Sequence, residues 1–238
     1  MTDILNIIQT RHSTRVPFDN SHPIAKEDLR QILDAARWAP TAHNMQNFEV
    51  VVVDDPKLLT VIGNIQRPTS TNFIRENYAQ LSFSEEELLR KKVGLLGTMF
   101  PPSWRNPDAK PETASELEET SRPIPASPVL LFALYDPNRR APASEGDFLG
   151  IISLGCIMEN MWLVAQSLGI GFQIVSAFGA DAVEEEEVKR LLNIPKPLKI
   201  AFAVRLGYPG VTPGKYLRVR RDIEDFTHHN QFGDKGLE

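Results

Sequence analysis

The chain has 238 residues, of which 42% are hydrophobic and 24% are charged, and its formal net charge is −5 at pH 7. This length supports a sizeable core in one large domain or two small ones, and the negative net charge argues against a general nucleic-acid-binding surface. The only cysteine, Cys156, excludes an intramolecular disulfide and a zinc site built from several cysteines.

The chain begins with a short predicted helix that leads into a basic cluster. Apolar residues from Ile4 to Ile8 are at helical spacing behind Thr2 and Asp3, which are good capping types. Residues 11–15 then read Arg-His-Ser-Thr-Arg. Arginine offers a planar fork of donors and the hydroxyls add short donors, so this cluster is suited to a phosphate group. Clusters of this composition also occur on surfaces without a ligand, so the motif alone is a weak signal.

A second cluster follows an amphipathic helix predicted from Lys26 to Trp38. Pro40 ends that helix, and residues 39–46 read Ala-Pro-Thr-Ala-His-Asn-Met-Gln. The side-chain amides of Asn44 and Gln46 carry donors and acceptors that suit a flat heterocycle. A helix stop followed by a turn would explain the same residues without any ligand.

Strands and helices alternate along the rest of the chain, which predicts a layered fold of mixed α/β or α+β type. Four consecutive valines in the strand predicted at 48–53 indicate burial on both faces. A capping box at residues 84–87 predicts a helix through about residue 99. The other patterns predict, in chain order, a helix at 57–65, a strand at 129–135, a helix at 146–168, a strand at 172–175, a helix at 181–192 and a strand at 198–206.

The helix predicted at 146–168 is apolar on nearly every side. A helix of this kind is buried, either in a large core or against a second subunit. Cys156 lies in its middle among apolar neighbours, so we expect a core residue rather than a nucleophile.

Residues 68–127 interrupt the alternation with an irregular segment that ends in a proline-rich loop. Long loops of this kind inside a compact domain are usually functional or mobile. Two interpretations stay open, a segment that covers an active site and an excursion at the surface. Residues 210–238 form an extended polar tail, and the adjacent His228 and His229 in it predict no metal site because a third ligand at suitable spacing is missing.

Five motifs in this order resemble the FMN-dependent nitroreductase family. They are the two clusters at 11–15 and 39–46, Leu-Gly-Ile-Gly at 168–171, Ile-Val-Ser-Ala-Phe-Gly at 174–179, and Gly-Tyr-Pro at 207–209 followed by Leu-Arg-Val-Arg-Arg at 217–221. The likeness covers roughly residues 4–66 and 127–232 and leaves the proline-rich middle unmatched. Each motif alone is weak, but five in the right order are a strong signal.

The chain also departs from the family pattern. Asn47 and Phe48 stand where the family commonly has Pro-Trp, Glu159 stands where Gln is usual, and Arg15 stands where some members have Lys. These differences bear on the substrate more than on the flavin.

The resemblance implies an α+β (α/β layered) fold, with a central mixed sheet flanked by helices, in an intertwined homodimer. Residues 1–238 would form one nitroreductase-like domain, with an insertion at about 68–127 and the tail at about 210–238. The dimer would hold FMN in a cleft between its two subunits.

The resemblance also implies which residues contact the flavin. Arg11 and Ser13, met by Arg218 and Arg220 from the tail, would neutralise its phosphate, with His12 as a further donor. Arg15 would place a cation near N1 and O2 of the ring. The contacts expected for the ring or ribityl chain come from the partner's second cluster, Pro40, Thr41, Ala42, Asn44 and Gln46, and those near N5 come from the backbone amides of Ser176 and Ala177.

The implied reaction passes hydride from NADH or NADPH through N5 of FMN to a small electron-poor acceptor, such as a nitroaromatic compound or a quinone. Such chemistry needs no side-chain acid or base, so no catalytic residue is predicted. Two alternatives stay open: different flavin chemistry on the same fold (dehalogenation, flavin fragmentation or heterocycle oxidation), and a flavin-binding protein without turnover.

We expect no nucleic-acid partner. We also expect no signal peptide and no stretch of the ~20 apolar residues that span a bilayer, and therefore no membrane contact and a cytoplasmic location.

Overall fold

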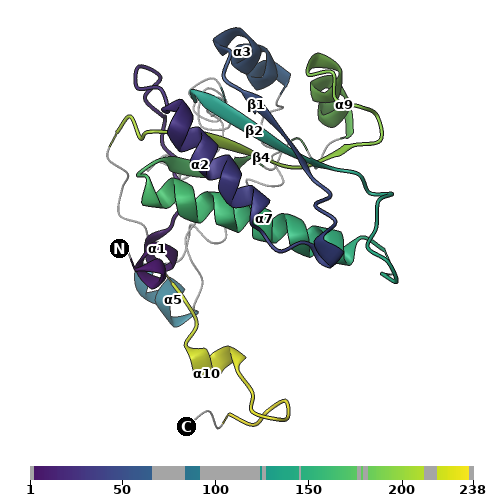
Figure 1. Ribbon diagram of the computed structural model, residues 1–238. Helices are drawn as coiled ribbons and strands as arrows, with labels where there is room; N and C mark the ends of the chain where they lie inside the picture. The colour runs from purple at the N-terminus through teal and green to yellow at the C-terminus, as the bar shows by residue number, and fades with distance from the viewer. Residues whose placement is uncertain are drawn as a thin grey trace. The chain divides into compact units, whose positions relative to one another are not determined.

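Four antiparallel strands form the central sheet, in the order β1-β2-β4-β3 (Figure 1). The computed structural model describes residues 3–65, 84–91, 124, 127–144, 146–175, 178, 182–211 and 219–235. The α+β class is confirmed, whereas the described strands contain no parallel pair of the mixed sheet that was expected. Apolar patterns locate strands, but strand direction depends on how the connections run. The strands are β1 (Glu49–Val53), β2 (Val129–Tyr135), β3 (Gly171–Val175) and β4 (Lys199–Gly207).

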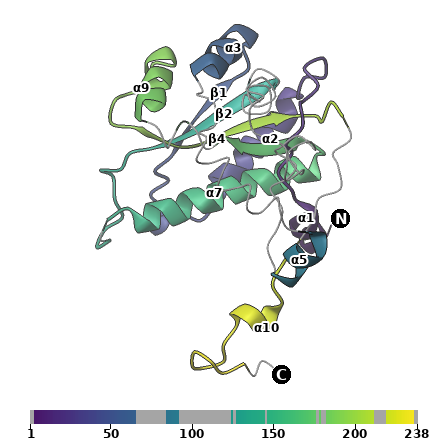
Figure 2. The same ribbon diagram turned by 180° about the vertical axis from the view of Figure 1, so that it is seen from behind.

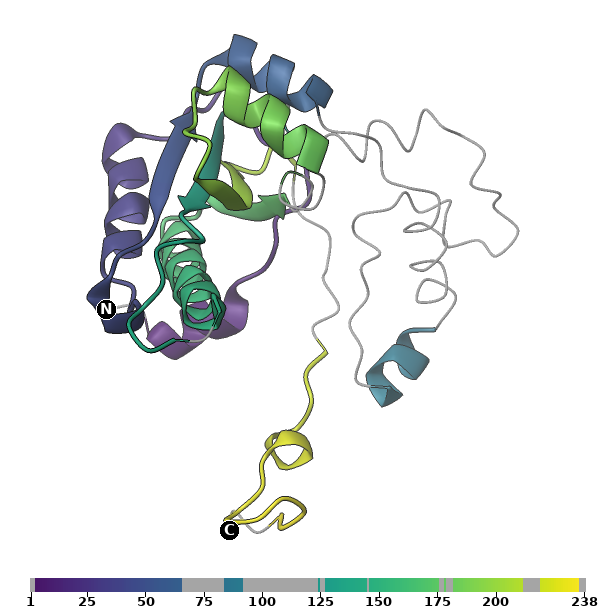
Figure 3. The same ribbon diagram turned by 90° about the vertical axis from the view of Figure 1, so that its right-hand side faces the viewer.

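Helices cover both faces of this sheet (Figures 2 and 3). Helices α2 (Lys26–Arg37) and α7 (Phe148–Ser167) pack on one face, and α3 (Pro56–Ile65) and α9 (Ala182–Leu191) pack on the other. Successive side chains of β2 alternate between the two cores, so that Leu131 joins the α2–α7 side and Phe132 joins the α3–α9 side. The sheet is therefore buried at its centre on both faces.

Helix α7 supplies the largest share of the first core. It packs along α2 and against β3, and the side-chain amide of Asn160 donates to the carbonyl of Ala35 at 3.1 Å. Within the described chain it is the one helix long and apolar enough to cross a membrane, so the expectation that no stretch has this length and composition is wrong. Its packing between α2 and the sheet is that of a core helix.

The N-terminal half of α7 is only partly covered within one chain. Phe148, Ile151 and Ile152 are 67%, 53% and 47% exposed, so of the two predicted environments, a large core and a second subunit, the core of one chain does not cover this half. Large apolar side chains gathered on one helix face favour a protein partner over solvent.

Strand β1 also differs from its predicted environment. It lies at an edge of the sheet, and Val52 is 37% exposed, so the expected burial on both faces is wrong for the single chain. A run of valines indicates a strand, but it carries no information on whether the strand is central or at an edge.

A buried arginine anchors the segment that follows α1 (Ile4–Thr10) to the sheet. Arg205 of β4 is 1% exposed, and its guanidinium donates to the carbonyl oxygens of Thr14 at 3.1 Å and Val16 at 2.7 Å. It also donates to the side chains of Gln173 and Ser127 and lies over the Phe18 ring, with Cζ 4.2 Å from the ring centroid.

The chain divides into two units. The first, Met1–Pro68 with Arg122–Pro213, holds the sheet, and the second comprises Thr69–Ser121 with Gly214–Glu238. In the second unit, α5 (Glu85–Arg90) begins with the predicted capping box of Ser84 and Glu87, and α10 (Ile223–Phe226) lies in the tail. The predicted continuation to residue 99 and the proline-rich loop lie outside the described residues, and the single domain stays a prediction.

Replacing Arg205 with methionine should lower the free energy of unfolding by about 2–4 kcal/mol, because buried carbonyl oxygens would lose their donor. Urea unfolding followed by circular dichroism measures the change. Arg190→Met, at an exposed position of α9, is the matched control and should shift stability by less than about 0.5 kcal/mol. Equal effects of the two substitutions would show that the Arg205 contacts do not stabilise the fold.

Candidate functional site

The first cluster lies beside β3 in a conformation fixed by the sheet. The amide of Thr14 donates to the carbonyl of Phe172 at 2.9 Å, and the Thr14 side chain is 3% exposed. Together with the Arg205 contacts, this bond attaches the middle of the cluster to two neighbouring strands. The side chains of residues 11–15 are therefore presented from a rigid backbone rather than from a free loop.

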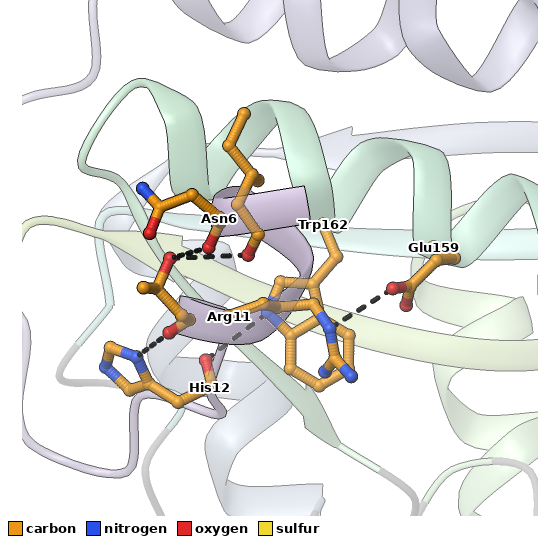
Figure 4. Close-up of polar contacts among 7 residues, drawn as sticks. Asn6, Arg11, His12, Glu159 and Trp162 are labelled. Carbon is orange, nitrogen blue, oxygen red and sulfur yellow. Dashed lines mark hydrogen bonds and ion pairs between the residues drawn. The ribbon is translucent and has the colours of Figure 1, made fainter. Parts of the chain in front are cut away.

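Arg11 is held on two sides by residues of α7 (Figure 4). Its guanidinium carbon lies 4.2 Å from the centroid of the Trp162 ring, and its Nε lies 3.2 Å from Oε1 of Glu159. The Nε–H is not aligned with that oxygen, so this buried nitrogen has an ion pair but no hydrogen bond. Figure 4 shows Nε as the guanidinium nitrogen turned toward Glu159, with the two terminal nitrogens directed away from it.

His12 and Ser13 differ in the hydrogen bonds that they already make within the protein. Nδ1 of His12 lies 3.2 Å from the carbonyl of Thr10, so a hydrogen bond there requires the proton on Nδ1. The His12 carbonyl accepts from the Trp162 indole at 3.3 Å. Ser13 is half-buried, and its hydroxyl has no hydrogen-bond partner in the part of the chain that is described. Arg15 is also half-buried and already interacts with another part of the chain.

The second cluster is anchored to the other half of α7. The amide of Ala42, in the 3₁₀ turn η1 (Ala42–Asn44), donates to Oγ of Ser153 at 3.0 Å. The Gln46 amide donates to Oγ1 of Thr41 at 3.1 Å, and the side chains of Asn44 and Gln46 pair at 3.3 Å, whereas Pro40 is exposed.

Three residues of this loop have left-handed backbone conformations. The φ angles of His43, Asn44 and Gln46 are 50°, 52° and 47°. Asparagine tolerates this region better than most residues, but three such angles in four positions form a costly backbone. Strained backbone of this type is concentrated at binding sites, which favours a ligand over a simple helix stop.

The two clusters contact α7 at different places. The first contacts α7 at Trp162 and the second contacts it at Ser153, nine residues earlier, which is ~13 Å along a helix axis. Each cluster, together with its contacts to α7, is called a half-site below.

A pocket that is partly open to solvent adjoins the second half-site. Asn47 forms one wall of it by holding the turn after β2. Its side-chain nitrogen donates to the carbonyl oxygens of Asp136 and Arg139, both at 2.9 Å, and its side-chain oxygen accepts from the Asp136 amide at 3.2 Å. The proline that the family commonly has at this position has no side-chain amide and could not make these bonds. The lining residues include Thr41, Ala42, Met45, Tyr135, Arg139, Arg140, Ser153 and Ile157.

Tyr135 is one of the residues that line this pocket. Partial burial raises the pKa of the Tyr135 phenol, and the carboxylates of Asp147 and Glu185 add to the effect. The phenol therefore keeps its proton well above neutral pH.

Several predicted site residues cannot be placed against these half-sites. Ser176, Ala177 and Arg218 lie outside the described residues. Arg220 belongs to the second unit, where its NH1 donates to the carbonyl of Val219 at 2.7 Å. Their contacts stay predictions.

The roles of four residues that hold the half-sites were not predicted from the sequence. They are Trp162, Ser153, Arg205, and Asn47 with its hydrogen bonds to the turn after β2. Two of them carried a visible signal. Arg205 is a charged residue within an apolar strand, and Ser153 is a polar residue within an apolar helix, and both patterns indicate a specific buried partner.

The chain belongs to the nitroreductase family, which it matches over residues 8–208. It is 19% identical over 229 residues to an NADPH-dependent oxidoreductase of Staphylococcus aureus strain USA300, covering 96% of this chain and 74% of that protein. Membership of this family supports an oxidoreductase in general terms.

Solved structures share the fold. A nitroreductase with bound FMN from Bacteroides fragilis gives a TM-score of 0.60 at 19% identity, over 97% of this chain and 100% of that one. A nitroreductase with bound FMN from Desulfitobacterium hafniense gives 0.61 at 22% identity, also over 97% and 100%.

Replacing Asn47 with alanine should release the turn after β2, because three hydrogen bonds are lost together, and should cost about 1–3 kcal/mol of stability. Hydrogen exchange at residues 136–144 should quicken, which mass spectrometry can follow. Asn138→Ala in the same turn is the control, since the Asn138 side chain makes no hydrogen bond with described residues. If the two variants exchange alike, Asn47 does not hold the pocket wall.

Proposed function

We propose that this chain is an FMN-dependent oxidoreductase that works as a homodimer, with NADH or NADPH as the hydride source. The observation that carries the proposal is the donor set of the first cluster. Arg11 turns its two terminal guanidinium nitrogens away from Glu159 (Figure 4), the Ser13 hydroxyl makes no hydrogen bond with described residues, and both residues are presented from a backbone held by Arg205. Unused donors on a rigid frame fit an oxyanion, and the phosphate of FMN is such a group.

The charge of the first cluster also suits a phosphate. Arg11 supplies one guanidinium, and the family resemblance implies that Arg218 and Arg220 of the tail would add two more. Charge-assisted hydrogen bonds of this kind contribute on the order of 1.5–3 kcal/mol each. The FMN bound by the fold relatives from Bacteroides fragilis and Desulfitobacterium hafniense supports the same assignment.

Two features of α7 support the dimer. The half-sites of one chain contact this helix ~13 Å apart, and a partner packed along the helix would place its second cluster opposite the first cluster of this chain. The exposed side chains of Phe148, Ile151 and Ile152 lie near the half-site at Ser153, and burying them against a partner would stabilise the assembly.

The protein's part in the reaction is positioning and charge. When bound, FMN supplies hydride transfer from the nicotinamide to an electron-poor acceptor, such as a nitroaromatic compound or a quinone. Arg15 would hold a cation near N1 and O2 of the ring, and the rigid loop from Thr41 to Gln46 would orient the flat rings at contact distance. The relative from Staphylococcus aureus, named for NADPH dependence, supports a nicotinamide donor.

The function is tested with the purified protein. We expect a yellow protein that releases FMN on denaturation, is bleached by NADH or NADPH under anaerobic conditions, and regains colour when a nitroaromatic compound or a quinone is added. If FMN is bound but neither NADH nor NADPH reduces it, the protein binds flavin without catalysing this reaction, and the enzyme proposal fails. Absence of flavin binding would refute the proposal as a whole.

The dimer predicts that Ile152→Glu yields a monomer with little flavin, because a charge would be buried at the proposed interface. Light scattering gives the mass, and absorbance gives the flavin content. Val61→Glu on α3 is the matched control, since Val61 is 45% exposed and Ile152 is 47% exposed. A dimer with normal flavin content in the Ile152→Glu variant would place the interface elsewhere.

A further inference from the structure

Glu159 puts a negative charge beside the arginine proposed to bind the flavin phosphate. Its Oε1 lies 3.2 Å from Nε of Arg11, and it precedes Trp162 by three positions, so both residues face Arg11 from the same side of α7. Glutamine is usual here in the family that the chain resembles, and glutamine would place a neutral acceptor at the same point.

The carboxylate is not needed to orient Arg11. The guanidinium already lies against the Trp162 ring, which is stacked in turn on Phe172 with 4.9 Å between ring centroids, and the Arg11 side chain is only 24% exposed. The Nε–H also makes no aligned hydrogen bond to Glu159, so the contact between them is mainly one of charge. Packing therefore fixes the arginine, and Glu159 chiefly changes the electrostatic potential around it.

We propose that Glu159 weakens the binding of phosphate-bearing ligands at Arg11 and so reduces the preference of this site for FMN over riboflavin. The inference rests on the proposed function, because it takes the first cluster to be the flavin-phosphate site. The terminal nitrogens of Arg11, directed away from Glu159, remain able to bind the phosphate. The bound phosphate then lies near a carboxylate of its own sign, and this repulsion lowers the affinity.

Riboflavin isolates the effect because it has the same ring and lacks the phosphate. In the flavin-free protein, Glu159→Gln should lower the Kd for FMN by about threefold to tenfold and change the Kd for riboflavin by less than about twofold. Quenching of flavin fluorescence measures both constants. Added sodium chloride should weaken FMN binding more in this variant than in the unaltered protein, since the site is then more positive.

Glu187→Gln is the control for net charge. Glu187 is exposed on α9, which packs on the opposite face of the sheet from α7, and its substitution should leave both constants unchanged. If both carboxylates had the same effect on FMN, the cause would be the charge of the whole protein and the proposal would fail.

The remaining outcomes separate this inference from the proposed function. The ratio of the Kd for riboflavin to the Kd for FMN decides between them. If FMN binds more tightly than riboflavin and Glu159→Gln leaves this ratio unchanged or lowers it, the role of Glu159 is refuted and the flavin assignment stands. If FMN and riboflavin bind equally and the ratio stays at one in the variant, Arg11 does not bind phosphate and the inference fails with the phosphate site. If neither flavin binds, both proposals are refuted.

Discussion

The hydrogen bonds of Arg205 to the carbonyl oxygens of Thr14 and Val16 are the constraint on which the site depends. A cation that is 1% exposed is costly to bury, and it is retained here by several acceptors and an aromatic ring. These bonds join the segment after α1 to the centre of the sheet. Together with the bond from the Thr14 amide to Phe172, they limit the directions in which Arg11 and Ser13 can point, so the proposed phosphate site would lose less entropy on each binding event than a site on a free loop.

Helix α7 contributes both to the core of the fold and to the two half-sites. Its buried residues form the core with α2 and the sheet, while Ser153, Glu159 and Trp162 contact the two clusters. Because both clusters contact the same rigid helix, the distance between the two half-sites within a chain is fixed. A second chain packed on the exposed face of this helix is the arrangement that would bring a first cluster opposite a second one, and the apolar character of that face favours it.

Periodicity in the sequence predicted most of the fold. Apart from α5, whose predicted continuation lies outside the described residues, the elements from β1 to β4 lie within a few residues of their predicted ranges. The alternation in β2 separates the two cores as a two-sided strand should. The edge position of β1 and the antiparallel pairing could not be predicted, because they depend on where distant strands lie. The sequence also did not predict contacts between residues far apart in the chain, such as Asn47 with Asp136 and Arg11 with Glu159. One residue of each pair, Asn47 and Glu159, departs from the family pattern.

The most direct test of the central claim, a flavin site shared between two chains, uses a heterodimer of two damaged chains. One chain carries Arg11→Glu in the first cluster, and the other carries Ala42→Trp in the second. In a shared site, the heterodimer holds one undamaged pair of clusters, so it should bind one FMN while neither parent homodimer retains any. A heterodimer as devoid of FMN as its parents would show that both clusters act within the same chain, and would contradict the shared site.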